Sequence, residues 1–144
     1  MTWAKDMLEN MKQGTHQVPP IVRTLQLGLI DDWGDGWIRK TWHPKPELLQ
    51  NDGTMFGGYI AALFDQAFAF AAMTVMEDDE ACRTTSLNIS FISISRSEDI
   101  LIAAKVVSRS RRLITVEATL SSNTGEIRSI ATAQQMITKK TPPS

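Results

Sequence analysis

The stretch TMFGGYIAALFDQAFAFAAMTVM, residues 54–76, decides the fold of this chain. It is almost entirely apolar, it opens on the glycine pair Gly57 and Gly58, and it carries one charged residue, Asp65. Its length and its alanine-rich composition favour an α-helix over a strand, from about residue 57 to residue 76. Because the segment is apolar all round, we expect a helix that is buried on every side.

A membrane span is the main alternative for this segment, since its length is close to that needed to cross a bilayer. Asp65 and Gln66 lie at its centre, however, where an acidic residue costs roughly 2.5–3.5 kcal/mol on insertion. The segment has no flanking cluster of Lys or Arg and runs into the acidic sequence EDDE. We therefore expect a helix in a protein core and no membrane contact.

A period of two follows the long helix and predicts four strands joined by hairpins, an antiparallel meander. The phase slips at Phe91–Ile92, which predicts a bulge there. The apolar faces of the four strands are Leu87, Ile89 and Phe91; Ile100, Ile102, Ala104 and Val106; Ile114, Val116, Ala118 and Leu120; and Ile127, Ser129, Ala131 and Ala133.

The segment before the long helix predicts one helix and two strands. Apolar residues at helical spacing indicate a short amphipathic helix over residues 2–13. Residues 21–30 and 36–42 read as strands joined by the turn DDWGDG, and residues 46–50 as one helical turn inside a loop. We expect one domain over residues 1–144, with residues 1–18 as N-terminal helix and linker and residues 139–144 as a flexible tail.

A sheet must bury its apolar face against another layer, and the long helix is the only large apolar partner in the chain. The predicted fold is therefore α+β: an antiparallel sheet wrapped around one long central helix, plus a short N-terminal helix.

Composition excludes several classes of function. Fifteen basic and sixteen acidic residues give a net charge of −1, without the basic surplus typical of nucleic-acid-binding proteins. The single cysteine, Cys82, forms no internal disulfide, which fits a reducing, cytoplasmic location. With only His16 and His43 beside it, we expect no metal centre.

From about residue 19 to residue 137, the chain resembles the hotdog-fold acyl-CoA thioesterases of the PaaI-like branch. The resemblance is carried by GTMFGGYIAALFDQA (53–67), TSLNISFISISRSEDILIAAKVVSRSRR (85–112) and SIATAQQMI (129–137). The family pattern is Asn-x-x-Gly-x-x-His-Gly-Gly, with an acid seven residues after the last glycine. Gly53, Gly57, Gly58 and Asp65 fit this pattern; Phe56 replaces the usual His, Gln50 replaces the usual Asn, and Asn51 comes one position late.

The resemblance implies the hotdog fold, obligate homodimers that often pair into tetramers, and hydrolysis of an acyl-CoA substrate to a carboxylic acid and free coenzyme A. It implies no cofactor, since coenzyme A is part of the substrate.

Asp65 is the predicted general base or nucleophile. Its helical neighbours Gly58, Ala61, Ala69 and Ala72 are small and leave room beside the carboxylate, and an apolar setting makes a carboxylate a better base. The alternative is an acid that is merely satisfied by hydrogen bonds in a dimer seam.

Gly57 and Gly58 begin the helix, where backbone N–H groups lack intrahelical partners and suit a developing oxyanion. The alternative is a tight turn that leads into the helix. Gly58 and Asp65 are roughly 10 Å apart along the helix axis at 1.5 Å per residue, so one helix poorly supplies both groups to one thioester. We therefore predict an active site that is shared between two subunits.

Other candidate residues are polar or border the glycine pair. Thr84 lies where the family often has Ser or Thr, although an ordinary strand threonine is the alternative. Gln50 can orient water or a carbonyl, while Phe56 and Asn51 are candidate substrate contacts. Arg109, Arg111 and Arg112 form a candidate phosphate site for coenzyme A, or else a solvated turn.

The replacement of the usual His by Phe56 and of the usual Asn by Gln50 leaves a second function open, a hotdog protein that binds acyl-CoA or another ligand and hydrolyses it weakly or not at all. A hotdog dehydratase or hydratase is disfavoured, because such enzymes usually pair the acid with a His partner, and that partner is missing here.

Overall fold

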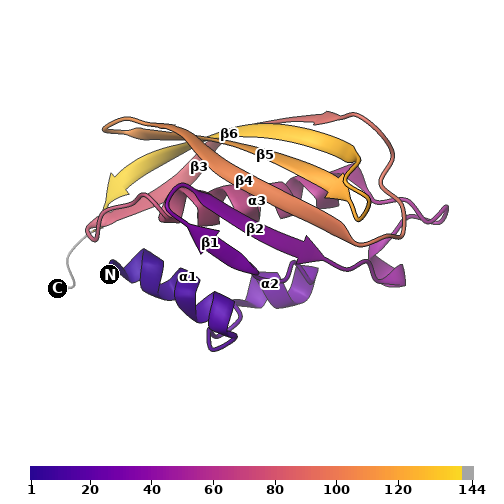
Figure 1. The fold of residues 1–144 in the computed structure, drawn as a ribbon, viewed down its shortest axis with the longest axis horizontal. Helices are drawn as coiled ribbons and strands as arrows, with labels where there is room; N and C mark the ends of the chain where they lie inside the picture. Colours follow the sequence, from indigo (N-terminus) through magenta and orange to yellow (C-terminus); the bar gives the residue numbers. More distant parts are fainter. Residues whose placement is uncertain (141–144) are drawn as a thin grey trace.

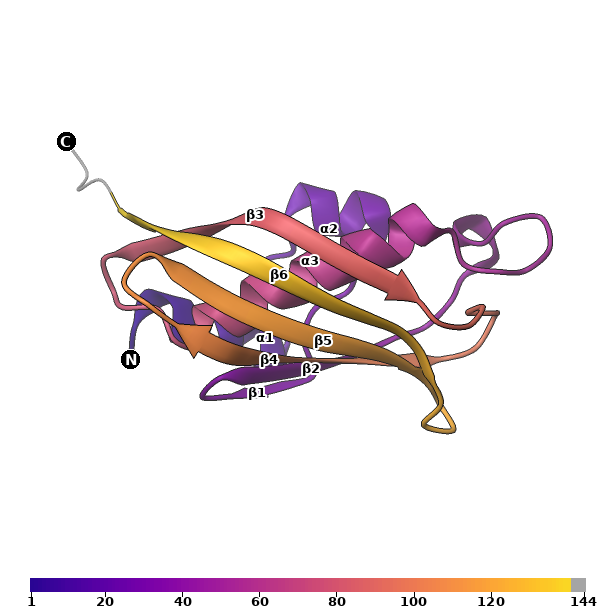
Figure 2. The same cartoon turned by 90° about the horizontal axis from the view of Figure 1, so that it is seen from above.

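The computed structural model describes residues 1–140. Six antiparallel strands form one sheet in the order β1-β2-β4-β5-β6-β3, and helix α3 packs against one face of it (Figures 1 and 2). This arrangement confirms the predicted fold class. The elements are α1 (Trp3–Gln13), α2 (Pro20–Leu25), β1 (Asp32–Gly34), β2 (Trp37–Trp42), the 3-10 turn η1 (Pro46–Leu48), α3 (Gly57–Met73), β3 (Glu80–Phe91), β4 (Ile100–Arg109), β5 (Leu113–Ser122) and β6 (Ile127–Lys139).

Helix α3 ends at Met73, three residues before the predicted end. The hydroxyl of Thr74 donates to the Ala71 carbonyl and accepts from the Gly36 amide, which satisfies polar groups where the helix stops. The prediction that the helix is buried on every side was wrong for a single chain, because Gly58 and Asp65 are exposed. The sheet covers the opposite side of the helix.

The strands β4, β5 and β6 form the predicted meander, with inward residues such as Ile102, Val116 and Ala131 buried. The predicted hairpin between β3 and β4 was wrong, because β3 pairs with β6 at the far edge of the sheet. Residues 92–99 carry the chain across, and Arg128 holds this crossover through Ser93 and Glu98. The alternation of apolar and polar residues predicts which side chains of a strand face inward, but it does not predict which strand lies beside it.

The bulge also lies elsewhere than predicted. The β3–β6 register shifts between Thr84 and Ser86, whereas β3 ends at Phe91 and the amides of Ile92 and Ser93 both donate to one carbonyl, that of Arg128. The break in phase at Phe91–Ile92 therefore marks the end of a strand.

Residues 21–30 do not form the predicted strand. Pro20 is in the first turn of helix α2, where its fixed φ is suited to a helix, and Gln26 ends the helix with a φ of 52°. β1 lies within the predicted turn DDWGDG, and the chain reverses at Asp35–Gly36 instead, where Gly36 has a φ of 84°.

The N-terminal helix is confirmed as α1, which is capped by Thr2 and by Gly14 in the left-handed region. Its buried residues, Ala4, Leu8 and Met11, join the core. At the other end of the chain, β6 extends to Lys139, and the rest of the expected tail, residues 141–144, lies outside the described residues.

Candidate active site

Asp65 lies on an exposed stripe of α3 that the sheet does not cover. The stripe also holds Gly58 and the half-exposed Ala61, Gln66 and Ala69, whereas Ala72, predicted beside them, is buried. β3 borders the stripe on one side, because Asp65 bonds to Thr84 of that strand. The segment after α2 borders it on the other, because the Gln66 side chain donates to the Gly28 carbonyl at 2.7 Å. The carboxylate is thus accessible on a surface with small neighbours, as catalysis requires.

The carboxylate of Asp65 is part of a chain of three hydrogen-bonded side chains. Thr84 Oγ1 donates to Asp65 Oδ1 at 2.7 Å, and Gln135 Nε2 donates to Thr84 Oγ1 at 2.8 Å. The structure therefore brings together two of the predicted site residues. Our reading of the sequence missed Gln135; the signal was a glutamine that follows Ala131 and Ala133 at the inward positions of β6.

The first turn of α3 leaves backbone donors free. Tyr59 and Ile60 donate to the Phe56 carbonyl, while the Gly57 and Gly58 amides have no acceptor among residues 1–140. Phe56 occupies the N-cap position and provides no side-chain cap. Two free N–H groups at the positive end of a helix dipole can stabilise an oxygen that gains negative charge.

Two aromatic rings flank these glycines. A Cβ on Gly58 would lie 2.7 Å from Phe56 Cε1, and a Cβ on Gly57 would lie 3.3 Å from Phe91 Cζ. Both rings are more than half exposed. Because neither glycine has a side chain, the two rings can lie beside the free amides.

The loop before α3 forms one wall of a cavity of about 410 Å³. The Gln50 amide in this loop donates to Thr54 Oγ1 at 3.1 Å and to the Met55 carbonyl at 3.4 Å, and the neighbouring Asn51 is exposed. The structure places Gln50 in the cavity wall with Gly57. The other lining residues are Asp52, Thr54, Met55, Ile60, Phe91, Ile92, Ser93, Ile94 and Ser95.

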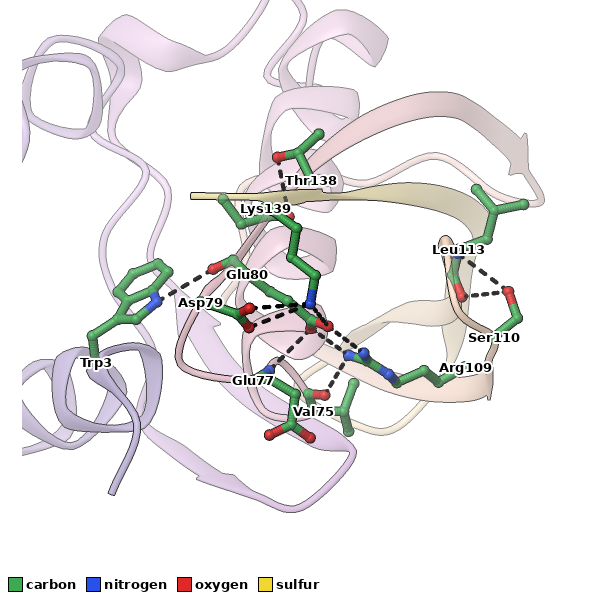
Figure 3. Close-up of polar contacts among 11 residues, drawn as sticks. Trp3, Val75, Glu77, Asp79, Glu80, Arg109, Ser110, Leu113, Thr138 and Lys139 are labelled. Carbon is green, nitrogen blue, oxygen red and sulfur yellow. Dashed lines mark hydrogen bonds and ion pairs between the residues drawn. The ribbon is translucent and has the colours of Figure 1, made fainter. Parts of the chain in front are cut away.

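The three predicted phosphate contacts divide into two kinds. Arg109 donates to both carboxylate oxygens of Glu80, at 2.7 and 2.8 Å, and to the Val75 carbonyl (Figure 3). The guanidinium donors of Arg109 are therefore already hydrogen-bonded at the C-terminal end of α3. Arg111 and Arg112 are exposed on the β4–β5 hairpin and form no ion pair within residues 1–140. The structure therefore does not bring these arginines together with the glycines of the same chain.

Lys40 is a buried cation that the sequence analysis did not single out. Its Nζ donates to the Leu27 carbonyl at 2.6 Å and to Gln66 Oε1. Burial lowers the pKa of Lys40 to about 7, and the nearby Asp31 offsets part of this effect. Together, Lys40 and Gln66 connect the segment after α2 to helix α3 at the residue that follows Asp65.

Within residues 1–140, no group of three or more His, Cys, Asp or Glu side chains could hold a metal ion. No helix in the described part of the chain is long and apolar enough to cross a membrane.

Several solved structures share this architecture. A phenylacetic acid degradation-related protein of Ralstonia eutropha JMP134, assigned as a thioesterase, has 26% identity and a TM-score of 0.79 over 90% of this chain and 98% of its own. A thioesterase of Haemophilus influenzae has 18% identity and a TM-score of 0.80 over 92% and 90% of the two chains. A Streptococcus mutans protein bound to acetyl CoA has 20% identity and a TM-score of 0.71 over 78% and 90%.

These similarities confirm the hotdog fold, an antiparallel sheet around one long helix, and the resemblance to its PaaI-like members. The profile of the thioesterase superfamily matches residues 52–128, more than half of the chain. The chain therefore belongs to the thioesterase superfamily. A comparison with curated protein sequences gives no match.

Proposed function

We propose that this protein is an acyl-CoA thioesterase with Asp65 as general base or nucleophile. The observation that carries the proposal is the position of Asp65: its carboxylate is exposed on the small-residue stripe of α3 and is held by Thr84. Membership of the thioesterase superfamily supports the reaction class. The acetyl CoA in the Streptococcus mutans structure and the coenzyme A in a thioesterase-like Streptococcus pneumoniae structure support the substrate class.

The residues suggest how the reaction proceeds. In the general-base route, Asp65 accepts a proton from a water molecule whose oxygen attacks the thioester carbon. The carbonyl electrons move onto oxygen, where the Gly58 amide donates a hydrogen bond, with Gly57 beside it. The intermediate then collapses, the C–S bond breaks, and coenzyme A leaves as a thiolate. Cys82 is a poor competing nucleophile, because burial raises the pKa of its thiol to about 11.

The proposed active site combines residues of two subunits. Gly58 and Asp65 are seven residues apart in one helix, roughly 10 Å at 1.5 Å per residue. β3 is an edge strand of twelve residues, and its outer row of backbone groups is available to a second copy. Pairing two β3 strands about a two-fold axis would bring two α3 helices side by side in opposite directions. Asp65 of one subunit would then approach the glycine pair of the other.

We assign the remaining candidates the following roles in this shared site. Gln50 in the cavity wall orients the thioester or the attacking water, and Phe56 and Asn51 contact the substrate beside the glycines. Arg111 and Arg112 are available for the phosphates of coenzyme A. Arg109 is a weaker candidate, because its donors are bonded to Glu80 and Val75.

A thiol-release assay over a panel of acyl-CoA thioesters tests the proposal. Asp65→Asn should lower kcat/KM by about a thousandfold or more, because an amide cannot accept the proton. Asp35→Asn is the matched control, since Asp35 is an exposed acid on the β1–β2 turn. A parent protein that cleaves no thioester, or an Asp65→Asn variant with parent activity, contradicts the proposal.

A mixed dimer tests whether the site is shared. One chain carries Asp65→Ala, and the other carries Gly58→Pro, which removes the amide donor in the first turn of the helix, where the backbone accepts proline and the exposed Phe56 ring can turn aside. A shared site predicts that the mixed dimer regains about half of the parent activity, because one of its two sites is intact. Activity no higher than that of the two variant homodimers contradicts sharing.

One observation favours a second candidate, a binding protein with little hydrolytic activity. Phe56 replaces a polar residue of the family pattern, and its ring packs against Gly58. Calorimetric binding of a non-hydrolysable acyl-CoA analogue, together with a parent that releases no thiol, would support this candidate.

A further inference from the structure

Gln135 is a fully buried polar residue directly behind the candidate active site. It is 0% exposed, and it lies opposite Thr84 in the β3–β6 register. Its Nε2 donates to Thr84 Oγ1 at 2.8 Å, and Thr84 Oγ1 is 2.7 Å from Asp65 Oδ1. Gln135 therefore acts on Asp65 through Thr84.

The direction of these hydrogen bonds follows from the number of protons. A hydroxyl group has one proton to donate, whereas an amide NH₂ group has donors and no acceptor. Because Gln135 Nε2 donates to the Thr84 oxygen, the Thr84 proton is free to point at Asp65 Oδ1. With the amide reversed, the Gln135 oxygen and the Asp65 carboxylate would compete for that single proton. In the orientation that the structure gives, the Thr84 proton goes to Asp65, and Oδ2 of Asp65 has no hydrogen-bond partner among residues 1–140.

This arrangement leaves a polar atom unsatisfied. Gln135 Oε1 is buried and has no partner within residues 1–140. An unsatisfied buried acceptor lowers the stability of the folded state. Two buried residues next to this position are apolar, Ala133 on the same strand and Ile114 opposite on β5. A leucine would avoid the cost, so packing alone does not account for a glutamine here.

The backbone also contributes to the arrangement. The register of β3 shifts between Thr84 and Ser86, which makes Thr85 the extra residue of a bulge. The hydroxyl of Thr85 donates to the Gln134 carbonyl at 3.3 Å. Bulges redirect the side chains beside them. Here the bulge adjoins the one residue that connects Gln135 to Asp65.

We propose that Gln135 is a positioning residue for thioester hydrolysis: by donating to Thr84 it directs the Thr84 proton onto Asp65, which holds the carboxylate in place with one oxygen free for the attacking water. The inference rests on the proposed function, and it adds a residue that does not itself touch the substrate.

A double-mutant cycle tests the inference. Gln135→Leu and Thr84→Val should each lower kcat about tenfold with KM within about twofold, because each removes the fixed hydroxyl donor. The double variant should be no slower than Thr84→Val alone, since Gln135 acts only through that hydroxyl. Gln134→Leu is the matched control: Gln134 is the adjacent glutamine, and it accepts from the hydroxyl of Thr115 instead. Independent effects that multiply to about a hundredfold, or a Gln135→Leu variant with parent kcat, overturn the inference.

A second measurement separates this positioning role from a merely structural one. The chemical shift of Asp65 Cγ, measured by NMR at one neutral pH, should change by a similar amount in Gln135→Leu and Thr84→Val, because the fixed hydroxyl donor to the carboxylate is lost in both. Gln134→Leu should leave this chemical shift unchanged. The melting temperature of Gln135→Leu should equal or exceed that of the parent, and Gln135→Met, with its unbranched side chain, replaces it if the leucine variant fails to fold.

The two proposals fail in different ways. A parent that cleaves no acyl-CoA overturns the proposed function, and the inference with it. An active parent whose kcat is unaffected by Gln135→Leu overturns the inference alone.

Discussion

The two ends of helix α3 differ in how far their polar groups are hydrogen-bonded. At the C-terminal end, Arg109 donates to Val75 and to both oxygens of Glu80, a residue that is 3% exposed, and Lys139 is 3.5 Å from the same carboxylate (Figure 3). At the N-terminal end, Phe56 supplies no side-chain cap, and the amides of the glycine pair have no acceptor in the described part of the chain.

This difference indicates a structural role for the C-terminal end of the helix and a ligand-binding role for its N-terminal end. A buried charge must be paired, so the C-terminal network is a structural requirement once Glu80 is inside. Free amides at an exposed helix start cost little free energy, because water can hydrogen-bond to them, and they remain available to a ligand. Substitutions at the C-terminal end should therefore change folding, and those at the N-terminal end should change catalysis.

The largest effect is expected from Arg109→Met. This change leaves the Glu80 carboxylate buried without its main partner, which should lower the free energy of unfolding by about 3–5 kcal/mol. Chemical denaturation followed by circular dichroism measures it. Arg111→Met is the matched control on the same hairpin and should change stability by less than about 0.5 kcal/mol. Equal losses in the two variants would show that the network does not fasten this end of the helix.

The pH dependence of stability sharpens the same comparison. Hydrogen bonds from Arg109 lower the pKa of Glu80 from the ordinary value of 4.5 to about 2. Because the folded pKa lies below the unfolded one, the stabilisation is complete above pH 4.5 and is lost as the pH falls toward 2. The loss should reach about 3 kcal/mol at most.

Denaturation midpoints measured between pH 6 and pH 2 check this expectation. The Glu80→Gln variant cannot titrate at this position, so its stability should depend less on pH over the same range. Parallel curves for the parent and the variant would assign the acid sensitivity to other groups.

The sequence predicted the parts of the fold that depend on local pattern. The apolar run from Gly57 gave the central helix, and period-two alternation gave the inner faces of the strands. Strand pairing depends on contacts between distant residues, so the position of β3 beside β6 was missed. The short helix α2 was also missed, because the β-branched residues Ile21, Val22 and Thr24 favour a strand in isolation, whereas Pro20 begins a helix.

The candidate site was predicted to a similar extent. A lone acid behind two glycines pointed to Asp65, and the structure places Thr84 against it. Gln135 and Lys40 could not be assigned, because their roles depend on which strands are neighbours and which side chains are covered. Arg109 looked equivalent to Arg111 in the sequence, and only the packing of Glu80 against it distinguishes the two.

The smallest effect is expected from Phe56→Ala at the N-terminal end. The Phe56 side chain is 59% exposed, so its removal should change stability by less than about 0.5 kcal/mol. If the ring contacts the substrate beside Gly58, KM should rise about fivefold with kcat little changed, the equivalent of about 1 kcal/mol of apolar contact. Steady-state kinetics on the best acyl-CoA of the panel measures this. Ile21→Ala is the control, since Ile21 is also 59% exposed but lies on α2. A stability loss above about 1 kcal/mol with KM unchanged would mean that the Phe56 ring stabilises the N-terminal end of the helix, as Arg109 stabilises the C-terminal end. The contrast between the two ends would then not hold.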